Sequence, residues 1–167
     1  MPARGVDPAR YESRLAAFHL ALARAGVPGL IASRAERVRG APWLGDAGYA
    51  DWYLVRDMAA LGDLNRLAVA GEAGEAHAAV AALSGPGAGS VFALVRGDGA
   101  GRTAWWWLAK ARGIAYDTFY ASLPATVTLW RRQMVLGPTP EFALGGEAAP
   151  PSGVEAVRTE HAPVAVP

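Results

Sequence analysis

The amino-acid sequence predicts an α+β fold, in which helices cover one face of an antiparallel sheet. Three observations predict it. Apolar residues recur at helical spacing in some segments and alternate with polar residues in others. From residue 50 onward the two kinds of segment follow the order strand, helix, strand, strand, helix, strand. Clusters of glycine and proline separate the segments, as expected for turns and loops.

Length and composition exclude several classes of protein. The chain has 167 residues, the size of one domain with appendages, and its hydrophobic fraction of 52% supplies a core. A net charge of +1 is too balanced for a dedicated nucleic-acid binder. The absence of cysteine excludes disulfides and thiolate metal sites. No long apolar run predicts a membrane span or a secretory signal, so we expect a cytoplasmic protein without a membrane partner.

Residues 1–48 are expected to add a helix and a strand to the main domain. Asp7 can cap a helix over residues 8–25, and Gly26 can end it. Residues 29–39 then read as an exposed edge strand with polar residues on both faces. The helix carries one apolar stripe, formed by Leu15, Phe18, Leu22 and Ala25.

Residues 49–144 are expected to form the main domain. Asp57 can cap a helix. The Asp-Gly step in residues 97–101 tolerates positive φ, so this loop is expected to join its two flanking strands as a hairpin. The order βαββαβ is that of the split-βαβ, or ferredoxin-like, arrangement. We predict strands at 50–56, 90–96, 103–110 and 127–136, a short return strand at 141–144, and helices at 58–68, 75–83 and 116–123.

Residues 145–167 are rich in proline, glycine, alanine and glutamate and contain no aromatic residue. Such a composition is typical of a disordered tail, and His161 is then a solvated bystander.

The triple Trp105-Trp106-Trp107 indicates how the sheet is covered. Alternation along a strand sends Trp105 and Trp107 to one face and Trp106 to the other. Large apolar residues therefore occupy both faces, and two short helices cannot cover both. A homodimer that packs sheet against sheet would cover the second face.

Residues 50–136 resemble the dimeric α+β barrel superfamily, whose members include small monooxygenases, EthD-like proteins and NIPSNAP-like proteins. The order of elements and the apolar open face of the sheet carry the resemblance. The stretches ADWYLVRDMAALGDLNRLAV and LWRRQMVLGPTPEF are also similar to an uncharacterised bacterial family of this kind. The resemblance implies a homodimer and brings no catalytic signature. The segment 1–48 departs from the minimal barrel.

Motifs with defined chemistry are absent from the sequence. Neither glycine-rich segment is followed by Gly-Lys-Ser/Thr, and no Gly-x-Ser-x-Gly occurs. His19 and His77 are the only histidines outside the predicted tail, which is too few for a metal centre. We therefore predict no metal and no cofactor. His77 is expected on a solvated helix face, and His19 at the edge of the apolar stripe.

Alternation within the strands selects a set of candidate ligand-binding residues. Asp51 and Tyr53 share one face of their strand, and Arg131 and Gln133 share one face of theirs. An Asp51–Arg131 ion pair forms if these two strands are neighbours, and such a pair can serve structure alone. The tryptophans can likewise serve packing or form the aromatic wall of a pocket. The candidate set is Asp51, Tyr53, Trp105, Trp107, Arg131 and Gln133.

The leading functional hypothesis is a homodimer that binds a small, partly apolar molecule in an aromatic-lined pocket on the open sheet face. One alternative is a cofactor-independent monooxygenase or isomerase of the same fold, with Arg131 holding an anionic intermediate. A second alternative is a non-catalytic interaction module that docks a partner through its N-terminal helix. Whether the protein is an enzyme stays open.

Overall fold

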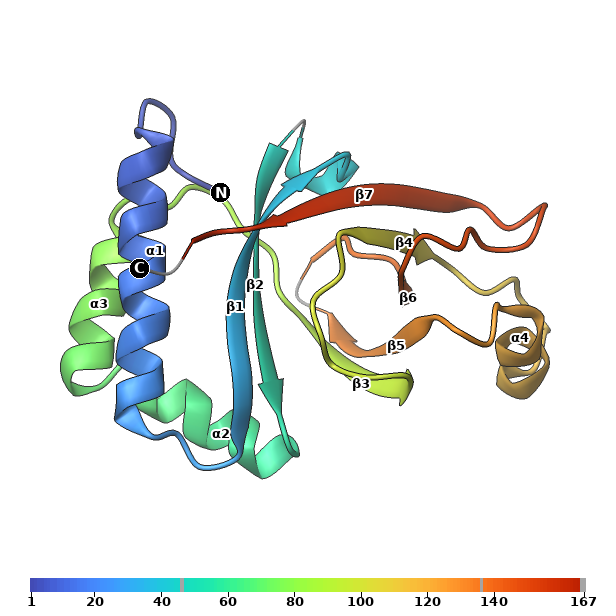
Figure 1. Cartoon of the computed structure of the whole chain (residues 1–167), viewed down its shortest axis with the longest axis horizontal. Coiled ribbons are helices and arrows are strands. Elements are labelled where there is room, and N and C mark those ends of the chain that lie inside the picture. The colour runs from blue at the N-terminus through green and yellow to red at the C-terminus, as the bar shows by residue number, and fades with distance from the viewer. Residues whose placement is uncertain (46, 136, 166–167) are drawn as a thin grey trace. The chain divides into compact units, whose positions relative to one another are not determined.

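A computed structural model describes residues 1–45, 47–135 and 137–165 (Figure 1). Leu136, the last residue of the predicted strand 127–136, and the last two residues of the predicted tail lie outside this description. The described residues form four α-helices and seven strands. The helices are α1 (Pro8–Ala25), α2 (Met58–Leu67), α3 (Gly71–Ala81) and α4 (Tyr116–Ser122); a 3-10 turn spans Pro42–Leu44; the strands are β1 (Leu30–Arg39), β2 (Ala47–Val55), β3 (Ser90–Arg96), β4 (Ala104–Leu108), β5 (Thr128–Val135), β6 (Phe142–Gly145) and β7 (Ala156–Pro163).

The chain divides into two compact units. The first comprises Met1–Arg37, Gly48–Pro86 and Ala162–Pro167, and the second comprises Val38–Ala47 and Gly87–His161. Each unit joins segments that are far apart in the sequence. The units therefore do not follow the predicted boundaries after residues 48 and 144.

Helix α1 forms as predicted and is central to the first unit. The Asp7 carboxylate accepts hydrogen bonds from the backbone amides of Ala9 and Arg10, and Gly26 ends the helix at φ 60°. Leu15, Phe18 and Leu22 of the apolar stripe are buried, whereas Ala25, its last residue, is exposed. This helix is thus part of a core rather than an added layer, and it does not offer its apolar stripe to a partner. Figure 1 shows α1 alongside α3, with α2 near their lower end.

Helices α2 and α3 follow β2 closely. The Asp57 carboxylate accepts from the backbone amide of Ala60 at 2.8 Å, so the predicted cap is confirmed. Helix α3 begins at Gly71, four residues earlier than predicted for the second helical segment. Leu64, Ala73 and Val80 of these helices are buried in the same core as α1. Ala60 is also buried. No helix among the described residues is long and apolar enough to cross a membrane.

The strands form an antiparallel sheet in the order β2-β1-β7-β4-β6-β5-β3. The α+β class is therefore confirmed. The sheet contains β1, β6 and β7 in addition to the four strands of the ferredoxin-like arrangement, so that arrangement is not confirmed. The predicted hairpin through residues 97–101 is wrong. Strand β3 pairs with β5, while β4 pairs with β6 on one side and β7 on the other, so no edge of β4 is left for β3.

The predicted disordered tail is also wrong, because residues 156–163 form strand β7. Thr159 and His161 are buried, while Arg158 and Glu160 are exposed. This alternation is typical of a strand with one covered face, although its buried positions carry polar residues. His161 is therefore an interior side chain rather than a solvated bystander.

The sheet of the second unit curls around its own aromatic side chains. In the strand order, β5 and β6 separate β3 from β4. A flat sheet would hold β3 and β4 about 14 Å apart, at about 4.8 Å per strand. The rings of Phe92 on β3 and Trp107 on β4 are nevertheless only 6.1 Å apart. This face of the sheet is thus covered by its own curvature, which provides the cover that the sequence argument assigned to a second subunit.

The opposite face of the same sheet is covered by α4. Phe119 and Leu123 pack on Leu129, Phe142 and Leu144. The rings of Phe119 and Phe142 lie 4.8 Å apart. Trp106 packs against this cluster, on the face opposite to its two neighbours, so the predicted alternation of the three tryptophans is confirmed.

Candidate functional site

A cavity of about 400 Å³ lies within the first unit. Its volume falls in the range of small-molecule sites. Three elements build it, each through its own periodicity: α1 contributes two residues seven apart, β2 contributes two residues two apart, and α3 with the turn after it contributes residues three and four apart. The main lining side chains are Tyr11, Phe18, Asp51, Tyr53, His77 and Ser84.

Asp51 supplies the carboxylate of this cavity. Asp51 is an exposed residue, but surrounding protein atoms remove part of the water from its carboxyl group. This partial loss of hydration raises the pKa of the Asp51 carboxyl to about 6, although the amino group of Met1 opposes the rise. Among the described residues, no arginine or lysine side chain forms an ion pair with Asp51. Asp51 can therefore exchange a proton close to neutral pH.

Two phenols border the carboxylate. Burial is the main cause that raises the pKa of Tyr53, and the nearby Asp51 carboxylate adds to it. Burial also raises the pKa of Tyr11, although the Ser84 hydroxyl partly offsets this. Both phenols therefore stay protonated at neutral pH and can donate a hydrogen bond into the cavity.

His19 lies behind Tyr53. The two rings stack with centroids 5.5 Å apart and planes inclined by 11°. The His19 side chain is buried, and neither Nδ1 nor Nε2 has a hydrogen-bond partner in the described structure. Burial lowers the pKa of His19 to about 4, so the ring is neutral at physiological pH. The neutral ring supports Tyr53 by packing. Protonation of the buried ring in acid would destabilise the folded state.

A smaller cavity of about 210 Å³ shares Phe18, Tyr53 and His77 with the first one. Leu61, Leu64 and Ala68 of the α2 region give it an apolar wall. The rings of Phe18 and His77 meet edge to face at 5.4 Å, between the two cavities. The site thus has a polar end at Asp51 and an apolar end beside α2.

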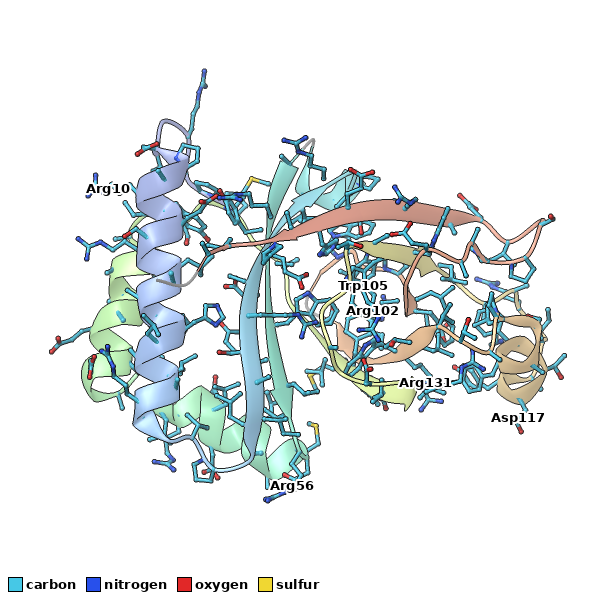
Figure 2. The ribbon with its side chains drawn as sticks, in the orientation of Figure 1. Arg10, Arg56, Arg102, Trp105, Asp117 and Arg131 are labelled. Carbon is cyan, nitrogen blue, oxygen red and sulfur yellow. The ribbon has the colours of Figure 1, made fainter. Side chains whose placement is uncertain are left out.

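The predicted tryptophans lie elsewhere, in the interior of the second unit. Trp105, which is labelled in Figure 2, is fully buried, and its ring lies 6.3 Å from that of His161. Trp107 contacts the ring of Trp43 at 5.3 Å, and its Nε1 donates to the Thr159 hydroxyl at 2.8 Å. Trp105 therefore faces a packed interior, whereas Trp107, although largely buried, also lines the cleft of the second unit that is described below.

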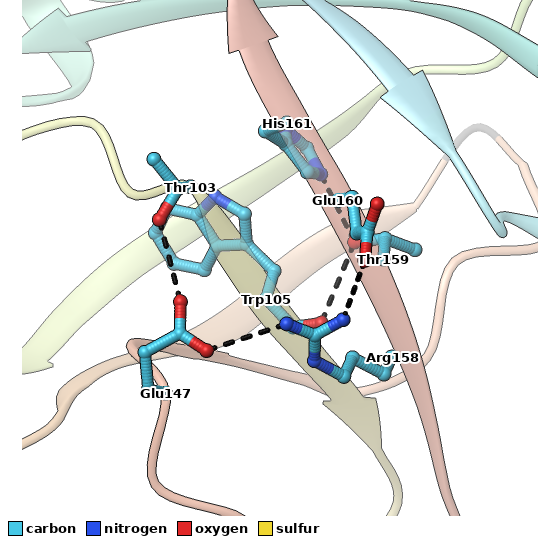
Figure 3. A network of polar contacts seen from close by, with 7 residues as sticks. All are labelled: Thr103, Trp105, Glu147, Arg158, Thr159, Glu160 and His161. Atoms are coloured by element: carbon cyan, nitrogen blue, oxygen red, sulfur yellow. Dashed lines mark hydrogen bonds and ion pairs between the residues drawn. The ribbon is translucent and has the colours of Figure 1, made fainter.

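Thr159 connects this interior to His161 (Figure 3). The hydroxyl lies 3.0 Å from Nε2 of His161 and 3.4 Å from the carbonyl oxygen of Trp105. On the exposed side of the same strand, Arg158 pairs with Glu160 at 2.8 Å and with Glu147 at 3.3 Å. The buried threonine and histidine are thus satisfied by hydrogen bonds, which explains how a strand of such low hydrophobicity is held in the sheet.

Arg131 and Gln133 belong to β5 of the second unit. The Arg131 guanidinium lies 5.0 Å from the ring centroid of Tyr116, in a cation–π contact near α4 (Figure 2). Gln133 is exposed. Strand β5 lies between β6 and β3, so the expectation that it neighbours β2, and with it the predicted Asp51–Arg131 pair, is wrong.

The second unit also has a cleft of its own, of about 780 Å³, at the end of β4 beside α4. Its wall is mainly apolar and includes Ile114, Phe119 and Val157, with Lys110 and Arg112 at the rim. The Lys110 ammonium is engaged, because it donates to the carbonyl oxygens of Ala111 and Ile114. Thr118, Ser122 and Glu155 add further polar groups to its lining.

Of the six predicted site residues, Asp51 and Tyr53 line the first-unit cavity together. Sequence reasoning missed Tyr11, Phe18, His77 and Ser84 as their partners. The helical spacing from Tyr11 to Phe18 is a signal for a shared face, but it does not reveal which strand that face meets. Across the described residues, no three histidine, cysteine, aspartate or glutamate side chains gather as a metal site.

Comparisons with protein-family models, with curated protein sequences and with solved structures find no match to this chain.

Proposed function

We propose that the protein binds a small, partly apolar molecule in the first-unit cavity. One observation carries this proposal: a carboxylate, two phenols and two further rings converge on a cavity of about 400 Å³ from three separate elements. Concave sites with an apolar wall and a few convergent polar groups are the usual form of small-molecule sites. This cavity lies in a different unit from Trp105 and Trp107, which the sequence analysis expected to line a pocket.

Backbone amide shifts in a two-dimensional NMR titration would test the proposal. The probes are 2-phenylethylamine, 2-phenylethanol and phenylacetate, which share one apolar body and differ in the polar end. We expect saturable shifts at Tyr53 and Ser84 with at least one probe. Ala81→Phe places a ring in the cavity and should abolish them. Ala78→Phe, at an exposed position of α3, is the matched control and should leave them intact. Absence of saturable shifts with all three probes would overturn the proposal.

Asp51 lines the cavity beside the phenol of Tyr53, and this arrangement favours an enzymatic use of the same cavity. A carboxyl with a pKa of about 6 is suited to accept and return a proton near neutral pH. This supports a cofactor-independent isomerase more directly than a monooxygenase. Incubation with propiophenone in heavy water tests it, with deuterium uptake at the α-carbon as the readout. Uptake at equal rates with the wild type and Asp51→Asn would refute this alternative.

We further propose that the chain forms a homodimer through β3. This strand ends the strand order, and Leu94 and Val95 expose 41% and 39% of their surface. Antiparallel pairing of two copies about Ala93 would place Val91 opposite Val95 and Phe92 opposite Leu94, which is an apolar, self-complementary register. An exposed apolar edge strand favours such pairing.

Light scattering after gel filtration tests the dimer. Val95→Lys should convert the dimer to a monomer, because it places two charges in the paired edge. Ile31→Lys, at a first-unit position that is 63% exposed, should not. A wild-type protein that stays monomeric at about 100 µM would refute the dimer, because the fraction of dimer rises with protein concentration.

A further inference from the structure

The chemistry of the first-unit cavity points to the charge of its ligand. We propose that the cavity selects a small organic cation, an amine with an aromatic or alicyclic body, whose ammonium group pairs with Asp51. This inference rests on the proposed binding function and adds the ligand class to it.

The polar end of the cavity presents the Asp51 carboxylate and electron-rich rings, and the Met1 amino group also acts on this carboxylate. Asp51 is the acidic residue among the lining side chains, and no described arginine or lysine side chain pairs with it. An ammonium group placed beside it would form a charge-assisted hydrogen bond. A carboxylate ligand would instead meet like charge in a partly dehydrated site, which is unfavourable.

The aromatic walls favour the same ligand. Tyr11 and Tyr53 lie near the Asp51 carboxylate, close enough for its charge to influence both phenols. The faces of such rings attract cations, and the attraction grows as water is excluded. The ring of Tyr11 also contacts that of Tyr49 at 4.9 Å, which fixes its position. The ammonium group can thus contact a carboxylate and an aromatic face together.

The body of the ligand has a separate place. The smaller cavity is separate but shares Phe18, Tyr53 and His77 with the first one, and Leu61 and Leu64 give it an apolar wall. The shared rings of Phe18 and Tyr53 can therefore contact the apolar body of a ligand whose amine lies at Asp51. This arrangement favours a molecule with charge at one end over a doubly charged one.

Calorimetric titration with the three matched probes tests the inference. We expect 2-phenylethylamine to bind about tenfold more tightly than 2-phenylethanol, the usual effect of one charge-assisted hydrogen bond. Phenylacetate should bind most weakly. Asp51→Asn should remove the preference for the amine and leave the alcohol unchanged. Asp63→Asn, an acidic position outside the cavity, is the matched control.

The pH dependence provides a second readout. The amine keeps its charge between pH 7.5 and 5, whereas Asp51 gains a proton over this range, so amine affinity should fall about tenfold. Tyr11 and Tyr53 stay protonated throughout. His77 also lines the cavity, and the Met1 amino group also acts on Asp51. The Asp51→Asn variant keeps these groups. The part of the fall in amine affinity that is absent from this variant is therefore due to Asp51.

The outcomes separate this inference from the binding function. Equal affinity of the wild type for the amine and the alcohol would overturn the cation inference and leave the cavity as a binding site. Tighter binding of phenylacetate would do the same. Absence of binding by all three probes would overturn the binding function, and with it this inference.

Discussion

His19 should make the first unit sensitive to acid. Its ring is buried, and burial lowers its pKa from 6.5 to about 4. Below pH 6.5 the unfolded chain binds a proton at this residue that the folded chain takes up only near pH 4. The free energy of unfolding therefore decreases as pH falls from 6.5 to about 4. Above pH 6.5, His19 is neutral in both states and causes no such loss.

The magnitude follows from the width of the window. Each pH unit costs about 1.36 kcal/mol, so about 2.5 pH units cost about 3 kcal/mol of the free energy of unfolding. His19→Leu removes the titrating group and also two buried nitrogens without hydrogen-bond partners. Removal of these nitrogens stabilises the folded state, but loss of the ring stacking on Tyr53 offsets part of this effect. At pH 7 we therefore expect the free energies of unfolding of the variant and the wild type to differ by about 1 kcal/mol or less.

Urea unfolding followed by helical circular dichroism is the appropriate assay, because α1, α2 and α3 all belong to the first unit. The difference in unfolding free energy between His19→Leu and the wild type should grow by about 3 kcal/mol from pH 7 to pH 4. Asp51, whose pKa is raised, acts in the opposite direction but in both proteins, so it cancels in the difference.

His77→Gln is the matched control for a histidine at an exposed position of the same unit. Its difference from the wild type should change much less with pH. A His19→Leu difference that stays constant between pH 7 and 4 would refute the account of His19 as a buried, neutral ring.

Three further substitutions test other parts of the structure. Asp51→Asn should gain stability relative to the wild type as pH rises from 4 to 7 in urea unfolding, because the raised pKa of Asp51 makes its ionisation costly in the folded state; a constant difference would contradict this. Thr159→Val should cost about 1–3 kcal/mol in the same assay, because the buried Trp107 indole loses its acceptor; an unchanged midpoint would show that this hydrogen bond is dispensable. Gly145→Ala places a methyl group 2.7 Å from the fully buried Trp105 ring, so overpacking should cost about 1–3 kcal/mol, and a neutral effect would mean that the ring can shift.

Local sequence patterns identified most of the individual elements. The helix over residues 8–25 was predicted with both ends, because Asp7 and Gly26 act on neighbouring backbone groups. The strand over residues 156–163 was missed. Its buried positions hold Thr159 and His161, whose burial depends on hydrogen bonds to partners more than fifty residues away or within the strand itself.

The candidate site was predicted only in part, because local patterns reveal the face of one strand but not its contacts with distant segments. The shared face of Asp51 and Tyr53 follows from alternation along one strand. Their partners on α1 and α3 are distant in the sequence, and no local pattern shows which helix face meets which strand face. Arg131 was assigned to this site on an assumed strand order that the structure does not have.

By itself, the sequence determined the α+β class, the ends of α1, the cap of α2 and the faces on which the tryptophans lie. These depend on backbone hydrogen bonding and side-chain periodicity within a few residues. Only the tertiary structure decided that β3 pairs with β5, that β4 lies between β6 and β7, and that three elements enclose Asp51. Strand pairing and cavity formation depend on contacts between distant segments, and several pairings satisfy the same alternation of apolar and polar residues.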